Sequence, residues 1–146
     1  MTHVYLPGKT DLNDYETKDL SPASTRHARF KALVTHALSA QLPAGTVLTE
    51  CGVATNEGVR APDVAWASAD FVVRHGDMTP LPQAPEVPVE IVSQSNTEAE
   101  MAMKTRAYLE AGASEVWLVA ASGALQVLSV QGEQPASRYG VALAVS

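Results

Sequence analysis

Residues 87–120 read VPVEIVSQSNTEAEMAMKTRAYLEAGASEVWLVA, and this stretch decides the fold. Its two apolar runs, at 87–92 and 114–120, have the length and composition of buried β-strands. Between them, Asn96 or Thr97 suits the N-cap of a helix, and Gly112 suits the position just beyond its C-terminus. A strand, a helix over residues 97–111 and a second strand form a right-handed crossover unit that joins parallel strands. The stretch therefore predicts an α/β domain.

The flanking sequence supplies the remaining elements of that domain. Ser21 and Pro22 are suited to begin a helix, which Pro43 should end, and five residues form its apolar stripe: Phe30, Leu33, Val34, Ala37 and Leu38. The β-rich segments are 46–54, 59–67, 71–74, 124–130 and 139–145, and residues 76–86 form a proline-rich loop. We expect a mixed β-sheet flanked by helices, an irregular lead-in over residues 1–20, and a single domain over 21–146.

Composition narrows the class of protein. Of 146 residues, 46% are hydrophobic and 18% are charged, a balance that excludes a disordered tail and a coiled coil. No apolar run approaches the roughly 18 residues of a membrane span, and the first residues lack the pattern of a secretory signal. Cys51 is the single cysteine, so it cannot form an internal disulfide. These features predict a soluble, cytoplasmic protein with no membrane partner.

The net charge of −6 is unevenly distributed. Residues 20–49 contain no acid but include Arg26, Arg29 and Lys31. These cations form either a solvated helix face or a patch that contacts the phosphates of a nucleic acid, and composition does not separate the two. His27 falls on the apolar stripe of the same helix, which favours a packed or capping histidine.

Three charged residues stand where the apolar pattern does not require them. Asp63 precedes a strand, Glu90 interrupts the apolar run 87–92, and Lys104 lies within a mostly apolar arc of its helix. Taken singly, each is usually a solvated surface residue. Two carboxylates about 4 Å apart repel each other by about 4 kcal/mol at an effective dielectric of 20. A hard cation such as Mg²⁺ removes that cost, activates water and offsets charge on a phosphoryl oxygen, and a nearby lysine can orient the water.

Four stretches resemble a known family. They are SPAS at 21–24 followed by His27; GVRAPDVAW at 58–66; VEIVSQSN at 89–96; and Lys104, Tyr108 and Gly112 with EVWLV at 115–119. Together they resemble the Uma-type "putative restriction endonuclease" family of bacteria, within the PD-(D/E)xK nuclease superfamily. The usual position of the superfamily's lysine is Val92 here, so the lysine is migrated to the following helix, and the step from Glu90 to Lys104 agrees with the family spacing.

This resemblance implies a restriction-endonuclease-like fold and a metal-dependent endonuclease that hydrolyses phosphodiester bonds in DNA. Asp63 and Glu90 would ligate Mg²⁺ or Mn²⁺ together with the backbone carbonyl of Ile91, and Lys104 would be the catalytic lysine. Arg26, Arg29 and Lys31 would contact the DNA backbone.

Two departures keep other interpretations open. The family has Ser-Pro-Ser where this chain has Ser-Gln-Ser at 93–95, and its N-terminal strand is shortened here around residues 15–16. A second hypothesis is a catalytically idle domain that serves as a nucleic-acid-binding or assembly module. The residues do not distinguish DNA from RNA as the substrate. A homodimer is expected because cutting both strands of a duplex needs two active sites.

Overall fold

The computed structural model describes residues 24–145, so the expected lead-in over 1–20 lies outside the described part of the chain. The elements follow in the order α1 (Thr25–Gln41), β1 (Thr46–Thr49), β2 (Val53–Thr55), β3 (Gly58–Arg60), β4 (Val64–Ala67), α2 (Ala69–His75), β5 (Val87–Ile91), α3 (Glu98–Glu110), β6 (Val116–Val119), β7 (Leu125–Ser129) and β8 (Gly132–Gln134). Helix α1 begins after Ser24 rather than after the expected Ser21, and the Ser24 hydroxyl accepts the His27 N–H at 3.0 Å.

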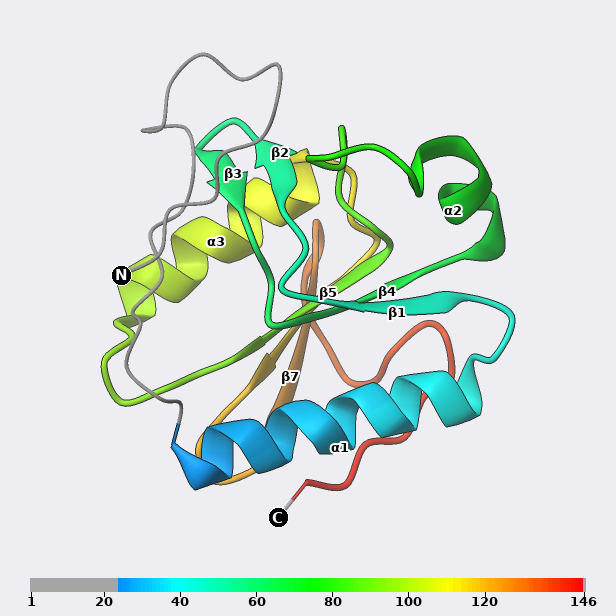
Figure 1. Ribbon diagram of the computed structural model, residues 1–146. Coiled ribbons are helices and arrows are strands. Elements are labelled where there is room, and N and C mark those ends of the chain that lie inside the picture. Colours follow the sequence, from blue (N-terminus) through cyan, green and yellow to red (C-terminus); the bar gives the residue numbers. More distant parts are fainter. Residues whose placement is uncertain (1–23, 146) are drawn as a thin grey trace.

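A mixed sheet of six strands forms the centre, in the order β1-β4-β5-β6-β7-β8, and β2 pairs with β3 in a separate hairpin. Strands β5 and β6 are parallel, and the other neighbours in the large sheet are antiparallel. The crossover predicted from residues 87–120 is therefore confirmed, with α3 as its connection. Helix α1 covers one face of the sheet, while α3, the β2–β3 hairpin and α2 lie on the other face (Figure 1).

Alternation along β5 explains why an acid interrupts its apolar run. Val87, Val89 and Ile91 join Phe30 and Val34 of α1 in one hydrophobic core. Successive side chains of a strand point to opposite faces, so Glu90 points to the face that α3 covers. A second core on that face includes Tyr108 of α3 and Val116 of β6.

The segment 71–74, which we expected to be a strand, is part of helix α2. The Ser68 hydroxyl caps the helix by accepting the Phe71 N–H at 3.1 Å. Asp70 and Arg74 form an ion pair at 3.0 Å, one helical turn apart. Phe71 is buried while Val73 is 85% exposed. The cap and the ion pair prevail here over the preference of Val72 and Val73 for strands.

Several other predicted strands begin or end at different residues in the structure. The segment 46–54 divides into β1 and β2 around Glu50, whose φ of 54° breaks the extended backbone, and 59–67 divides into β3 and β4. Residues 139–145 form no strand; their apolar side chains pack on the core beneath α1, and the Gln41 side-chain amide bonds to both the N–H and the carbonyl of Ala142, at 2.9 and 2.7 Å. Strand β8, which was not expected, pairs with β7 instead.

The cap of α2 makes a testable contribution to stability. Ser68→Ala removes the acceptor of the Phe71 N–H and should lower the free energy of unfolding by about 1 kcal/mol. Ser39→Ala, a change at an exposed position within α1, should alter it by less than about 0.5 kcal/mol. Urea unfolding of both variants measures the difference, and equal midpoints would contradict the assignment of Ser68 as a cap.

Candidate active site

The two predicted carboxylates meet at one end of the sheet. Val64 of β4 pairs with Val89 of β5, and Asp63 comes just before this last pair, so it lies at the end of the two strands, next to Glu90 and Ile91 of β5. The Ile91 N–H donates to Asp63 Oδ2 at 2.7 Å, which fixes the aspartate at this place. Asp63 and Glu90 are only 6% and 4% exposed.

Helix α3 supplies two partners to Glu90. The Tyr108 hydroxyl donates to Glu90 Oε2 at 2.8 Å, and Lys104 Nζ lies 3.8 Å from Glu90 Oε1. Residues four apart lie on the same side of a helix, which is why both side chains reach the same carboxylate. Lys104 is 9% exposed and holds its ammonium beside Glu90 instead of extending it into solvent. The structure therefore brings Asp63, Glu90 and Lys104 together.

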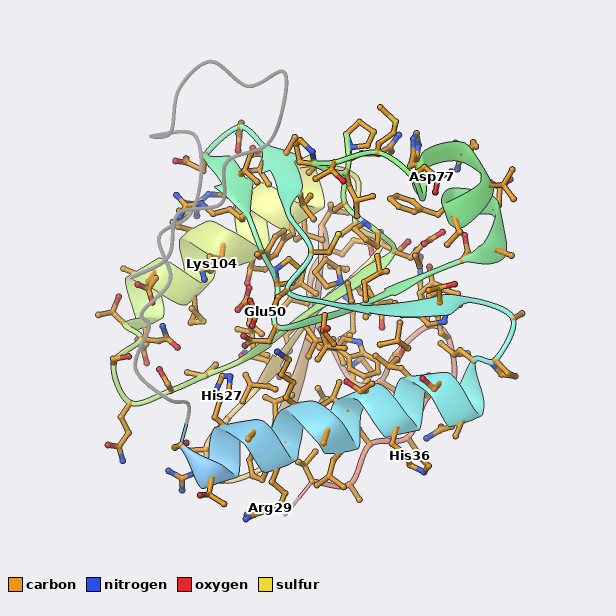
Figure 2. All side chains as sticks on the ribbon, viewed as in Figure 1. His27, Arg29, His36, Glu50, Asp77 and Lys104 are labelled. Atoms are coloured by element: carbon orange, nitrogen blue, oxygen red, sulfur yellow. The ribbon has the colours of Figure 1, made fainter. Side chains whose placement is uncertain are left out.

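His27 reaches the site from α1. Its Nε2 lies 3.7 Å from Asp63 Oδ1, and its side chain points from the helix toward the sheet (Figure 2). The Asp63 carboxylate raises the pKa of His27 above its ordinary value of 6.5, and partial burial opposes that shift. We expected a packed or capping histidine, but the structure places His27 beside a candidate metal ligand. The sequence pattern places His27 on the apolar stripe of α1, but the buried residues of that stripe begin only at Phe30, so His27 lies beyond the hydrophobic core.

Each acid of the site has a basic side chain beside it. Glu90 has Lys104 beside it, and Asp63 has His27, whose raised pKa favours its cationic form. Burying two carboxylates without such partners would be costly. The two basic partners lower the free-energy cost of burying the two carboxylates.

The three expected DNA-contact residues do not form one patch. Lys31 Nζ forms an ion pair with Glu50 Oε1 at 3.2 Å. Arg29 points away from His27 on the outer side of α1 (Figure 2), with its guanidinium 5.6 Å from the centre of the Phe30 ring. Arg26 is exposed in the first turn of the helix.

The donor set suits a hard divalent cation that keeps several water ligands. Within residues 24–145, no three His, Cys, Asp or Glu side chains are grouped so that they could hold a metal ion. Asp63, Glu90 and the carbonyl of Ile91 remain as oxygen donors. Mg²⁺ commonly uses one or two carboxylates and takes its other ligands from water and substrate phosphate. The residues present thus fit Mg²⁺ or Mn²⁺, and they do not form the closed set of four ligands of a structural zinc site.

The contact between His27 and Asp63 gives a prediction for the metal-free protein. Asp63→Asn removes the main cause of the shift, so the pKa of His27 should fall, because the burial and the Lys31 charge that lower it both remain. In the wild type, the contribution of this pair to stability is fully present below about pH 6.5 and is lost as the pH rises through the pKa of His27.

NMR titration of the imidazole resonances measures this shift. His36, which points outward from the same helix (Figure 2), is the internal control, and its imidazole resonances should be the same in both proteins. An unchanged pKa of His27 in Asp63→Asn would show that Asp63 does not act on it.

None of the described helices is both long enough and apolar enough to span a membrane.

Comparison with known proteins places this fold in a family. A crystal structure from Anabaena variabilis, of a putative nuclease belonging to DUF820, is similar to this chain with a TM-score of 0.72 at 15% identity, covering 97% of this chain and 85% of that one. This likeness confirms the restriction-endonuclease-like fold. No curated protein matches. Residues 9–138 match the family model Uma2, described as "Putative restriction endonuclease", and the chain belongs to that family.

Proposed function

We propose that this protein is a metal-dependent endonuclease that hydrolyses phosphodiester bonds in DNA. The observation that carries the proposal is the pair of buried carboxylates at the end of neighbouring strands, with a buried lysine 3.8 Å from one of them. Burying two acids and a lysine at the end of a sheet is costly and gives no packing advantage over apolar side chains. Membership of a family described as restriction endonucleases supports a phosphodiester substrate.

Asp63, Glu90 and the Ile91 carbonyl would hold the cation. When bound, Mg²⁺ or Mn²⁺ would acidify a water ligand and offset the charge that develops on the phosphoryl oxygens. The Ile91 N–H keeps Asp63 in a single orientation through its bond to Oδ2. His27 holds the same carboxylate from the side of α1.

Lys104 is the residue we assign to the reacting phosphate. Its ammonium is a compact charge with three donors, and burial beside Glu90 restricts where that charge can lie. In this position it can orient the attacking water and stabilise the negative charge of the pentacoordinate transition state. Lys104 belongs to α3 and not to β5, so its side chain reaches Glu90 from the helix that covers this face of the sheet.

DNA would approach the site along α1. Lys31 is ion-paired with Glu50, whereas Arg29 points to the outer side of α1 (Figure 2). Arg26 and Arg29 would then contact phosphates farther along the backbone. Such contacts make affinity fall with salt. A homodimer would supply the second active site that cutting both strands of a duplex needs.

Metal titration tests the site without a choice of substrate. We expect calorimetry to detect Mn²⁺ binding by the wild type and its loss in Asp63→Ala and in Glu90→Ala, because each change removes one of two carboxylate donors. Asp70→Ala, which removes an exposed acid of α2 that is paired with Arg74, is the matched control and should bind as the wild type does. Absence of Mn²⁺ binding by the wild type would favour the idle binding module.

Lys104→Gln separates metal binding from catalysis. Removing the ammonium relieves its repulsion of the incoming cation, so Mn²⁺ affinity should equal or exceed that of the wild type. Cleavage should fall by about 10²-fold or more, because the transition state loses its cationic partner. Cleavage of matched DNA and RNA oligonucleotides measures the rate and identifies the substrate. Unchanged cleavage by Lys104→Gln would remove the lysine from the mechanism.

A further inference from the structure

Tyr108 is a buried polar group of the site to which the proposed chemistry assigns no role. It is 0% exposed and belongs to the core on the α3 face of the sheet, where Phe71, Leu81 and Val116 are its neighbours in the same cluster. That packing fixes the ring, so the hydroxyl is delivered to one place. Its donation to Glu90 Oε2 at 2.8 Å is a hydrogen bond to a charged acceptor, which is stronger than one between neutral groups.

The two oxygens of Glu90 are thereby distinguished. Oε2 receives the hydroxyl of Tyr108, whereas Oε1 is the oxygen beside the Lys104 ammonium. Because one oxygen of Glu90 accepts a hydrogen bond, the carboxylate binds a cation more readily through a single oxygen than through both. Mg²⁺ requires near-ideal octahedral geometry with short bonds, whereas Ca²⁺ accepts more ligands, longer bonds and bidentate carboxylates.

We propose that Tyr108 is a positioning residue that holds Glu90 as a one-oxygen ligand and so makes the site selective for Mg²⁺ over Ca²⁺. This inference rests on the proposed metal site and adds to it the determinant of cation choice. A tyrosine that only filled the core would need a partner for its hydroxyl, but it would have no effect on the relative affinity for two cations of the same charge.

Tyr108→Phe tests this role because it removes one oxygen atom and keeps the buried ring. Affinities for Mg²⁺ and Ca²⁺ are measured by calorimetry on the full chain, with circular dichroism as the check of folding. We expect Mg²⁺ affinity to fall by about 10-fold or more, in the range found when outer-shell partners of metal ligands are removed. Ca²⁺ affinity should stay constant or rise, because Oε2 is released for bidentate binding.

Two further variants make the result specific. Tyr139→Phe is the matched control, because it removes a hydroxyl that donates to Ser114 Oγ at 2.9 Å. Ser114 comes just before the first residue of β6, whereas the site lies near the last residues of that strand. It should leave the ratio of the two affinities unchanged. In the Glu90→Asp background, which keeps a carboxylate but draws it back from the Tyr108 hydroxyl, Tyr108→Phe should have no further effect on that ratio.

The outcomes separate this inference from the proposed function. A selective loss of Mg²⁺ affinity in Tyr108→Phe supports it. An equal loss for both cations, or no loss, overturns it and leaves the metal site standing. A wild type that binds Ca²⁺ as tightly as Mg²⁺ overturns it without any variant, and a wild type that binds no divalent cation overturns the proposed function as well.

Discussion

The pairing of β4 with β5 is the constraint on which the rest of the site depends. The same register that aligns Val64 with Val89 brings Asp63 to the end of β5, where the Ile91 N–H bonds to the aspartate. A slip of one residue would turn every side chain of β5 to the other face, placing Glu90 in the apolar core beneath α1. The hydrophobic burial of Val87, Val89 and Ile91 against α1 therefore stabilises the arrangement of the polar residues on the opposite face.

The polar residues are in turn supported from both sides of the sheet. Helix α3 provides Lys104 and Tyr108 to Glu90, and the first turn of α1 provides His27 to Asp63. Each acid thus has a basic side chain beside it, and the Asp63 carboxylate raises the pKa of His27. A binding cation would have to compete with Lys104 and His27, which gives their substitution a clear expected effect on metal affinity as well as on catalysis.

Local signals in the sequence were reliable where the burial pattern and the caps agreed. The crossover over residues 87–120 is confirmed, with Thr97 as the N-cap of α3 and α3 ending at Glu110, before Gly112. The segment 71–74 shows the opposite case, because β-branched residues suggested a strand while the Ser68 cap and the Asp70–Arg74 pair stabilise a helix. At 139–145, the apolar composition could not reveal that the segment packs on the core without a strand partner and bonds through Ala142 to Gln41, far away in the chain.

The α/β class and the parallel crossover could be predicted from the sequence alone, which also showed that Asp63, Glu90 and Lys104 are unusually placed charged residues. It could do so because hydrophobic periodicity and helix caps act over a few neighbouring residues, and because a charge within an apolar run is visible without coordinates. The tertiary structure was needed to show that His27 contacts Asp63, that Tyr108 bonds to Glu90, and that Lys31 pairs with Glu50 while Arg29 lies on the outer side of α1 (Figure 2). Those relations depend on the register of strands and on the rotation of helices against the sheet, which are set by packing between residues far apart in the chain.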